Sequence, residues 1–336
     1  MIGKKTMKTE IYGTLGPACS RADILSDMLR LGMTGVRLNL SHMSLAEAEP
    51  MLTALRCAES ESGRYCRLLI DMQGPELRIG RLKSSVTLAE GERIDLPSLS
   101  FPDFLYEMIR PGQEILLDDG RLLLLAETER TAVVQRGGIL SGRKSIALPG
   151  TCIHLPPLTT EDLENIAHAV QFGVTGVMQP FVRSAADLQH VRKALETAGA
   201  GSVRLFAKIE DMNGVSCLPD LLGTADEIVI ARGDLGNAIP LWKLPAVQKQ
   251  ISAACRAAGK PFMVVTQMLS SMEQNPVPTR AEVSDIFNAV LDGAASVMVT
   301  GETAAGKYPR ETIRYLANTA AEAEAFLSQN AHITGN

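Results

Sequence analysis

Short apolar runs rich in Val, Ile and Leu recur along the chain, and each is followed by a longer stretch with the periodicity of a helix. Apolar runs of this length are typical of parallel strands that are buried on both faces. They predict strands at residues 11–16, 35–40, 67–72, 176–181, 204–209, 227–231, 262–266 and 296–300. Helices are predicted at residues 21–31, 45–61, 160–171, 185–198, 215–222, 242–258, 280–291 and 309–327. Eight strand–helix units with right-handed crossovers close into an α/β fold, the (β/α)8 TIM barrel.

One segment, residues 79–148, breaks this alternation. It holds short strand-like pieces at residues 85–88, 114–117, 121–127 and 131–135, which are separated by Gly and Pro. This pattern is typical of turns between short antiparallel strands. We therefore expect a small β domain inserted after the third strand. The expected domains are residues 1–78 (first part of the barrel), 79–148 (inserted lid domain) and 149–336 (second part of the barrel).

Composition and charge narrow the function classes. Hydrophobic residues make up 46% and charged residues 21% of the chain, as in ordinary globular proteins. The net charge of -5 is spread out, without a run of Lys and Arg that could neutralise nucleic-acid phosphates. The apolar stretch 11–17 is too short and Gly-rich for a signal sequence or a membrane span. We expect a cytoplasmic protein that binds neither nucleic acid nor membranes.

The cysteines are scattered, without a CxxC pair or a His at metal-ligand spacing. They are Cys19, Cys57, Cys66, Cys152, Cys217 and Cys255. We interpret them as reduced thiols. Cys19 lies beside a predicted strand end, but no base is close in sequence, so a packing role is expected for it rather than nucleophilic catalysis.

Polar residues gather where the predicted strands end, which is where the active sites of such barrels lie. They include Arg37, Asn39, Ser41, Asp71, Arg78, Lys208, Glu210, Asp234 and Thr266. Burying so many charges costs too much unless a ligand or metal compensates them. The cations together with a metal site point to an anionic substrate, either phosphorylated or a dicarboxylate.

The end of the sixth strand offers two kinds of ligand. Gly233 allows close backbone approach, so its amide and the next one can bind an anion, while Asp234 supplies a carboxylate. Glu210 and Asp234 could share one hard cation such as Mg2+, with Lys208 beside it.

Several of these residues also have a purely structural explanation. Lys208 and Glu210 point to the same side of a strand, so a structural ion pair explains them equally well. Arg232 precedes a turn, and we favour a buried scaffold pair for it. The sequence Asp118–Asp119–Gly120 indicates first a β-turn.

The motifs together resemble the pyruvate kinase family, in order and over nearly the whole chain. They are residues 14–17 (TLGP), 37–42 (RLNLSH), 74–78 (GPELR), 208–210 (KIE), 231–236 (ARGDLG), 266–269 (TQML), 275–285 (NPVPTRAEVSD) and 301–304 (GETA). The resemblance implies a short form of the family, with a reduced lid and without the C-terminal regulatory domain. We therefore expect no activation by sugar-phosphate effectors.

The resemblance implies transfer of a phosphoryl group from phosphoenolpyruvate to ADP, giving pyruvate and ATP in glycolysis. Arg37 and Lys208 would hold the moving phosphoryl group, and Thr266 would help protonate the enolate. The substrate carboxylate would meet the Gly233 and Asp234 amides and the Thr266 hydroxyl. The nucleotide side is assigned Asn39, His42, Arg78, Asp118 and Lys144.

The metal ions are implied in the same way. Mg2+ or Mn2+ would bind Glu210 and Asp234. K+ would bind Asn39, Ser41, Asp71 and the carbonyl of Met72. In the family, Glu76 goes with dependence on a monovalent cation. A homodimer is a possible assembly.

Departures from the family pattern keep a second function open. Met72–Gln73 replaces the family's Thr-Lys, and Gln179–Pro180 replaces its Ala-Ser, which changes the floor of the site. A metal-dependent lyase, aldolase or decarboxylase acting on a 2-oxo acid is the alternative, because an enolate held by Mg2+ serves either chemistry. The intact Lys208, Glu210 and Asp234 argue against a catalytically silent binding protein.

Overall fold

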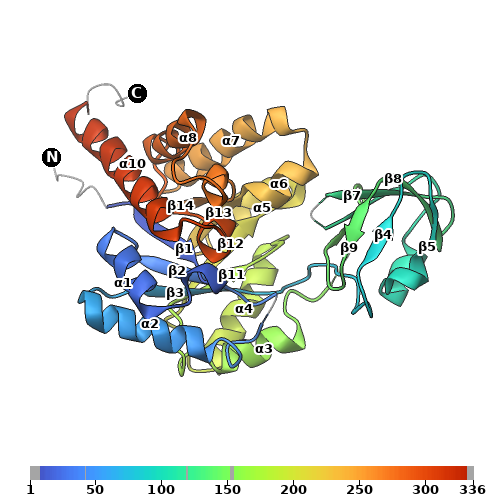
Figure 1. The fold of residues 1–336 in the computed structure, drawn as a ribbon, viewed down its shortest axis with the longest axis horizontal. Coiled ribbons are helices and arrows are strands. Elements are labelled where there is room, and N and C mark those ends of the chain that lie inside the picture. Colours follow the sequence, from blue (N-terminus) through green and yellow to red (C-terminus); the bar gives the residue numbers. More distant parts are fainter. Residues whose placement is uncertain (1–7, 42, 119, 152–154, 331–336) are drawn as a thin grey trace. The chain divides into compact units, whose positions relative to one another are not determined.

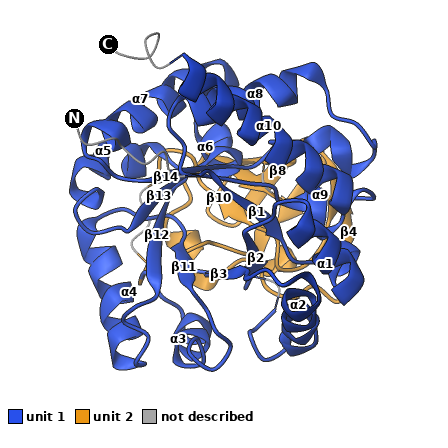
Figure 2. Ribbon diagram, turned by 90° about the vertical axis from the view of Figure 1, so that its left-hand side faces the viewer, with its two compact units in different colours: residues 1–74, 157–336 blue, residues 75–156 orange. Residues whose placement is uncertain are grey.

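The computed structural model describes residues 8–41, 43–118, 120–151 and 155–330. The chain divides into two compact units. Unit 1 comprises residues 1–74 and 157–336, and unit 2 comprises residues 75–156 (Figure 2). The insertion expected at residues 79–148 lies inside unit 2.

Unit 1 is a closed barrel of eight parallel strands. Their order around the barrel is β1, β15, β14, β13, β12, β11, β3 and β2. The strands are β1 (Glu10–Thr14), β2 (Gly35–Asn39), β3 (Arg67–Asp71), β11 (Gly176–Gln179), β12 (Arg204–Ile209), β13 (Glu227–Ala231), β14 (Phe262–Val265) and β15 (Ser296–Met298). All eight predicted strands are confirmed, with ends shifted by at most two residues, and the TIM barrel is therefore confirmed as the fold.

Helices surround these strands, as Figures 1 and 2 show. They are α1 (Ala22–Arg30), α2 (Glu49–Ser62), α3 (Thr160–Ala167), α4 (Ala185–Thr197), α5 (Met212–Leu221), α6 (Arg232–Ala238), α7 (Leu244–Ala257), α8 (Arg280–Leu291), α9 (Gly301–Ala304) and α10 (Pro309–Gln329). Short 3-10 turns lie at Pro17–Cys19, Leu241–Lys243 and Ser270–Glu273. Two predicted helices were too long: α2 begins at Glu49 rather than 45, and α3 ends at Ala167 rather than 171.

The barrel strands are mainly apolar because both of their faces are buried, whereas their polar and charged residues occur mostly toward the strand ends. A large core, which includes Leu25, Leu68 and Ile230, fills the space between strands and helices. A second cluster fills the barrel interior. Its members are Tyr12, Leu69, Met178, Phe206, Val229, Ala231, Met263, Val265 and Met298.

Polar side chains lie below this interior cluster, at the N-terminal ends of the strands. Glu227 is 1% exposed, and its carboxylate pairs with Arg204 at 2.6 Å and accepts a hydrogen bond from the Ser296 hydroxyl. Tyr12 donates a hydrogen bond to Glu10 at 2.6 Å. In barrels of this kind the N-terminal end usually contributes to stability, whereas the C-terminal end carries the active site.

Unit 2 contains two antiparallel sheets and its own apolar core. One sheet has the order β10, β6, β7, β8 and β5, and the other pairs β4 with β9. The strands are β4 (Val86–Leu88), β5 (Arg93–Asp95), β6 (Glu114–Leu117), β7 (Leu122–Ala126), β8 (Thr131–Arg136), β9 (Gly138–Leu140) and β10 (Ile146–Ala147), with 3-10 turns at Leu96–Leu99 and Asp103–Glu107. The core includes Leu96, Leu105, Ile115, Leu117 and Leu124.

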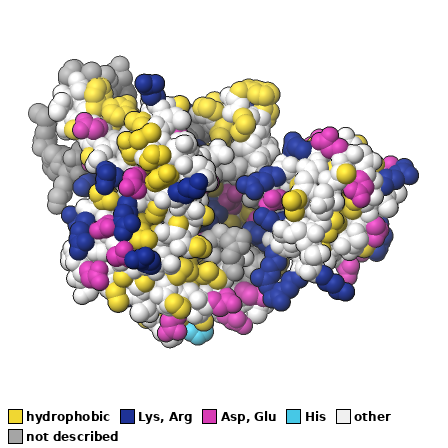
Figure 3. All heavy atoms as spheres, in the orientation of Figure 1, with side chains coloured by type: hydrophobic (Ala, Val, Ile, Leu, Met, Phe, Trp, Pro, Cys, Tyr) yellow, Lys and Arg dark blue, Asp and Glu magenta, His cyan; other side chains and the backbone are white. Residues whose placement is uncertain are grey.

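The surface of the barrel is mixed in character. On the face drawn in Figure 3, basic and acidic side chains alternate with apolar ones.

Within the described ranges, no helix combines the length and the apolar character needed to cross a membrane.

Candidate active site

The candidate site is built from residues at the C-terminal ends of the barrel strands. Arg37 lies on β2, Asp71 ends β3, and Lys208 lies on β12 with Glu210 directly after that strand. Parallel strands bring these ends to one rim of the barrel. The register agrees, because Asp71 pairs with Asn39 of β2 on one side and Met178 of β11 on the other.

Four predicted residues meet there in one buried ion-pair network. Asp71 Oδ2 lies 2.7 Å from both Nε and an amino nitrogen of Arg37, and 3.3 Å from Lys208 Nζ. Lys208 Nζ also lies 2.8 Å from Glu210 Oε1. The side chains of Asp71 and Glu210 are 3% and 0% exposed. The structure therefore brings Arg37, Asp71, Lys208 and Glu210 together.

Together with the nearby Asp234, this network holds three carboxylates against two cations. Burial raises the pKa of Glu210, and the nearby Asp234 adds to the rise, although Lys208 opposes it. Burial alone would lower the pKa of Lys208, but Asp71 and Glu210 outweigh this effect and raise it. Both shifts describe a site in which the carboxylates lack sufficient positive charge.

At this rim, two buried carboxylate oxygens of the described residues are incompletely satisfied. Asp71 Oδ1 has no such partner, and Glu210 Oε1 has only the ion pair with Lys208, without a well-aligned hydrogen bond. An unsatisfied buried anionic oxygen is costly unless a cation or water meets it. Both oxygens therefore suit a metal ion.

The chemistry of the donors fits the ions that the sequence suggests. Glu210 and Asp234 offer carboxylate oxygens, which Mg2+ prefers. No cluster of three or more His, Cys, Asp or Glu residues with metal-binding geometry occurs in the described ranges, so water or substrate oxygens would complete the shell. For K+, Asp71 Oδ1 is the unsatisfied oxygen, while Asn39 Oδ1 accepts the Ser41 amide at 3.1 Å.

Glu210 is also tied to the end of the neighbouring strand. Its Oε2 accepts the backbone N–H of Phe181 at 2.7 Å, and Phe181 has a left-handed φ of 47°. A bulky residue in this conformation is strained and needs support from its surroundings. Glu210 gives that support, so it connects the chain after β11 with the candidate metal site.

Thr266 follows β14 in an equally unusual conformation. Its φ is 76°, and that of Gln267 is 53°. Arg232 donates two hydrogen bonds to the Thr266 carbonyl, at 3.1 and 2.7 Å, and a third to Asp285 at 2.7 Å. The predicted scaffold role of Arg232 is confirmed: its guanidinium holds the backbone of Thr266 in place.

Gly233 lies against the same threonine. A Cβ atom at Gly233 would be 3.1 Å from the Thr266 methyl carbon, which is tighter than an ordinary contact. Glycine here keeps the backbone amides that open α6 close to the Thr266 side chain. The structure thus brings Gly233 and Thr266 together.

The residues expected on the nucleotide side lie on both units. Asn39 belongs to unit 1, whereas Arg78, Asp118 and Lys144 belong to unit 2, and His42 lies outside the described residues. In unit 2, Lys144 Nζ is 2.6 Å from Asp118 Oδ1. Arg78 pairs with Glu76 at 2.6 Å and donates to the Arg143 carbonyl at 2.8 Å.

The predicted turn at Asp118 is confirmed. Asp118 has a φ of 50°, and its carbonyl accepts the Arg121 amide at 3.0 Å, which closes a four-residue turn. Asp119 lies outside the described residues. The Asp118 side chain is nevertheless only 10% exposed, and it pairs with the partly exposed Lys144.

Two of the replaced residues, Met72 and Pro180, are apolar and buried, whereas Gln179 is buried and polar. Met72 is 1% exposed and belongs to the large barrel core. Pro180 fills the space beside Gly74, where a Cβ atom would come within 2.5 Å of the proline ring. Gln179 points away from the ion-pair network and donates to the Pro157 carbonyl at 2.6 Å.

Sequence reasoning missed two buried carboxylates near the rim. Asp162 accepts the amides of Gln73 and Gly74, and Glu302 accepts those of Leu269 and Thr300. Asp162 was visible only as part of a helix start. Glu302 was visible only within a family motif. All four partners are backbone amides, and backbone amides leave no pattern in the sequence.

Cys19 has the packing role that was expected. Its thiol is fully buried and donates to the Thr14 carbonyl at 3.4 Å. Burial raises the pKa of Cys19 to about 11, so the thiolate is disfavoured. The other described cysteines, Cys57, Cys66, Cys217 and Cys255, are also free thiols, and Cys152 lies outside the described residues.

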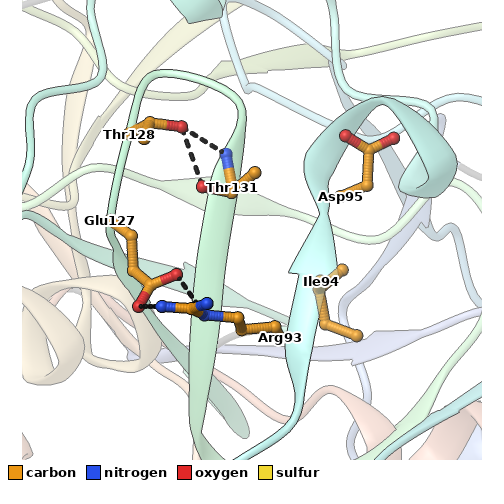
Figure 4. A pocket seen from close by; sticks show the side chains of 6 residues that line it. All are labelled: Arg93, Ile94, Asp95, Glu127, Thr128 and Thr131. Carbon is orange, nitrogen blue, oxygen red and sulfur yellow. Dashed lines mark hydrogen bonds and ion pairs between the residues drawn. The ribbon is translucent and has the colours of Figure 1, made fainter.

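A surface pocket of about 410 Å³ occurs in unit 2, but none of the candidate residues lines it. Its walls come from β5 and the β7–β8 hairpin, where Arg93 and Glu127 form an exposed ion pair (Figure 4). Four of its polar side chains pair with one another, Arg93 with Glu127 and Thr128 with Thr131. We therefore place the chemistry at the barrel rim.

Comparison with known proteins agrees with this geometry. The family model described as pyruvate kinase, barrel domain, matches residues 6–313. The chain is 36% identical to a pyruvate kinase of Sporosarcina psychrophila over 336 residues, which cover 95% of this chain and 57% of the relative. It is 38% identical to one of Corynebacterium efficiens and 37% identical to one of Aeropyrum pernix, covering 94% of this chain and 70% of each relative. The chain thus spans between 57% and 70% of the length of these relatives, and it belongs to the pyruvate kinase family.

Proposed function

We propose that the protein transfers a phosphoryl group from phosphoenolpyruvate to ADP, giving pyruvate and ATP. The observation that carries this proposal is the buried network of Arg37, Asp71, Lys208 and Glu210 at the barrel rim, with an unsatisfied oxygen on Asp71. Phosphoryl transfer needs little covalent chemistry from the protein; it needs positioning and neutralisation of phosphoryl oxygens.

The chain's own residues divide this task. Arg37 and Lys208 hold the moving phosphoryl group from two directions, since both are already fixed by Asp71. The Gly233 and Asp234 amides and the Thr266 hydroxyl bind the substrate carboxylate. Thr266 also helps to deliver the proton to the enolate carbon. Its backbone is pre-positioned by Arg232, so no reorganisation is required when the substrate binds.

Two kinds of ion complete the proposed site. Glu210 and Asp234 would hold Mg2+ or Mn2+, and Asn39, Ser41, Asp71 and the Met72 carbonyl would hold K+. When bound, these ions supply the positive charge that the carboxylates of the site lack. Asn39, His42, Arg78, Asp118 and Lys144 are proposed for the nucleotide. The proposal also includes a cytoplasmic location and a homodimer as the assembly to test first.

The decisive experiment is a coupled assay for pyruvate formed from phosphoenolpyruvate, with each of ADP, Mg2+ and K+ omitted in turn. The proposal expects pyruvate formation to depend on all three, with one ATP formed per pyruvate. Pyruvate that forms at the same rate without ADP would contradict it.

A second function is favoured by one specific observation. Pro180 packs beside Gly74 at a position where the family has a hydroxyl group, and Met72, at the other such position, is buried in the barrel core. A metal-dependent lyase, aldolase or decarboxylase acting on a 2-oxo acid could use the same enolate-binding rim without a nucleotide. Pyruvate released from oxaloacetate in the presence of Mg2+, without any nucleotide, would support this alternative.

A further inference from the structure

Residues 71–74, which are the last residue of β3 and the three residues after it, carry two of the four proposed K+ ligands, and we call this segment the β3 loop. These ligands are the carboxylate of Asp71 and the carbonyl of Met72. A backbone carbonyl cannot turn on its own, because it shares a rigid plane with the N–H of the next residue. In a trans peptide the two groups point in opposite directions, and no cis peptide occurs among the described residues. Whatever holds the Gln73 N–H therefore also aims the Met72 carbonyl.

Asp162, near the start of α3, holds this N–H. It is fully buried, and its Oδ1 accepts the Gln73 amide at 2.9 Å. Its Oδ2 accepts the amides of Gly74 and Thr159, both at 2.9 Å. Hydrogen bonds to a buried carboxylate are stronger than neutral ones and fix geometry more tightly. One side chain thus orients two successive peptides of the β3 loop.

The remaining contacts of the β3 loop leave it little freedom. The Met72 amide donates to the Met178 carbonyl at 3.1 Å. Gly74 has a φ of 58° and lies so close to the Pro180 ring that a Cβ atom would not fit. The loop is therefore fixed on the β11 side by packing and on the α3 side by Asp162.

We propose that Asp162 is a positioning residue, which aims the Met72 carbonyl and holds the end of β3 in the geometry that binds a monovalent cation. The inference rests on the proposed K+ site. It extends that proposal to a residue that would touch neither the cation nor the substrate. Residues that orient ligands of a metal in this way commonly change its affinity by about 10- to 100-fold when replaced.

A simpler role for Asp162 must be separated from this one. Asp162 is also the third residue of a helical capping box, in which the Thr159 hydroxyl accepts the Asp162 amide at 3.0 Å. A capping box, however, uses only one carboxylate oxygen, here Oδ2. The contact of Oδ1 with Gln73 lies outside the motif, and it is the contact that aims the Met72 carbonyl.

Two variants separate these roles. Asp162→Asn keeps the size of the side chain but replaces one acceptor oxygen by an NH2 group, so it cannot accept all three amides. Thr159→Ala removes the reciprocal half of the capping box and leaves the bonds from Asp162 to Gln73 and Gly74 in place. Both variants should weaken α3, but only the first should disturb the β3 loop.

Hydrogen exchange at the Gln73 and Gly74 amides gives a readout that is independent of activity. We expect faster exchange at both amides in Asp162→Asn and unchanged exchange in Thr159→Ala. Binding of K+, and of Tl+ as its spectroscopic substitute, should weaken by roughly tenfold or more in Asp162→Asn only. In the enzymatic assay, the K+ concentration for half-maximal activation should rise by the same factor.

The other outcomes separate failure of this inference from failure of the proposed reaction. Equal losses of cation affinity in both variants would show that Asp162 acts only through the stability of α3. Faster exchange in Asp162→Asn with unchanged affinity would show that the loop geometry does not control the cation. If the wild-type protein binds K+ in the expected way but transfers no phosphoryl group, the proposed reaction fails while the role of Asp162 stands. If it binds no monovalent cation at all, the inference fails with the proposed K+ site.

Discussion

At the scale of single residues, the two ends of the barrel use buried charge differently. At the C-terminal rim, Asp71 Oδ1 has no hydrogen-bond partner within the described part of the chain, as expected where a ligand binds. At the N-terminal end, both oxygens of Glu227 are bonded, one to Ser296 and one to Arg204. A buried acid whose oxygens are all bonded contributes to structure, whereas an unsatisfied oxygen needs an explanation, and at this rim the bound ligand that we propose supplies one.

Glu227 makes the stability of the protein depend on pH. Burial raises its pKa from 4.5 to about 7, and its bonds with Ser296 and Arg204 offset this only in part. Between these values the folded state binds more protons at this site than the unfolded state, so its stability falls as the pH rises from about 4.5 to about 7. Glu227→Gln removes this pH dependence. Between pH 4.5 and pH 7, the free energy of unfolding of the variant should therefore rise by about 3 kcal/mol relative to that of the wild type.

Urea unfolding at pH 5, 6, 7 and 8 measures this difference. Glu61→Gln, at an exposed position of α2, is the matched control, and its curve should run parallel to that of the wild type. A Glu227→Gln curve that is also parallel to the wild type would show that the buried acid does not control the pH dependence.

Arg232 offers a second test at this scale. A lysine has one compact charge and cannot reach the Thr266 carbonyl and Asp285 together, so Arg232→Lys should release the strained backbone of Thr266. We expect kcat to fall by about tenfold or more while KM changes less, because positioning is lost rather than substrate contacts. Steady-state kinetics would show this split. Arg314→Lys, on the exposed face of α10, should match the wild type, and an equal loss in both variants would disprove the positioning role.

At the scale of elements, the sequence predicted the barrel better than the insertion. The barrel strands are apolar on both faces, so runs such as Glu227–Ala231 are distinct from the helices around them. The strands β5, β9 and β10 in unit 2 have only two or three residues, and alternate residues such as Ile139 are exposed. Such pieces carry little pattern, and of the four described strands this short in unit 2 only β4 was predicted, at residues 85–88.

The same difference applies to the candidate site. The end of a strand can be predicted, and with it the side chains at that end and just after it, such as Lys208 and Glu210. The conformation of Thr266 could not be predicted, because threonine rarely adopts a positive φ and only the contact with Arg232 accounts for it. The contact of Asp162 with Gln73 joins segments almost ninety residues apart, and backbone amides have no sequence signature.

The insertion should be removable without unfolding the barrel. Its two connections meet at one side chain: Gln179 Nε2 donates to the Pro157 carbonyl at 2.6 Å, and a Cβ atom on Gly74 would lie 3.2 Å from the same nitrogen. A Gly-Ser-Gly linker can therefore join residues 74 and 157. We expect circular dichroism to show a folded α/β protein that unfolds cooperatively, and the coupled assay to show no phosphoryl transfer, because Arg78, Asp118 and Lys144 are gone.

Two results would contradict this prediction. An unfolded product would mean that the barrel depends on unit 2 for stability. Full phosphoryl transfer would mean that unit 2 has no part in binding the nucleotide.

At the scale of the whole molecule, ions should stabilise the fold. An ion that binds only the folded state adds about 2.7 kcal/mol when its concentration is a hundred times its Kd. Mg2+ and K+ together should therefore raise Tm by several degrees in a thermal unfolding scan.

Asp234→Asn should abolish the rise in Tm that Mg2+ causes, and it should also abolish turnover. Asp220→Asn, on the exposed side of α5, is the control that should keep both, and an unchanged Mg2+ effect in Asp234→Asn would rule out that residue as a ligand.

The barrel residues on either side of unit 2, Gly74 and Pro157, both lie next to Gln179, and this arrangement affects the order in which the chain folds. β3 pairs with β11, its neighbour in the barrel, across the whole of unit 2, and closing so long a flexible loop costs roughly 4 kcal/mol of entropy. If unit 2 folds first on its own core, that loop shrinks to a short bridge before β3 and β11 meet. During synthesis unit 2 also emerges before β11. Substitutions that weaken the core of unit 2, such as Leu117→Ala, should therefore slow the assembly of the barrel, even though Leu117 belongs to a different hydrophobic core.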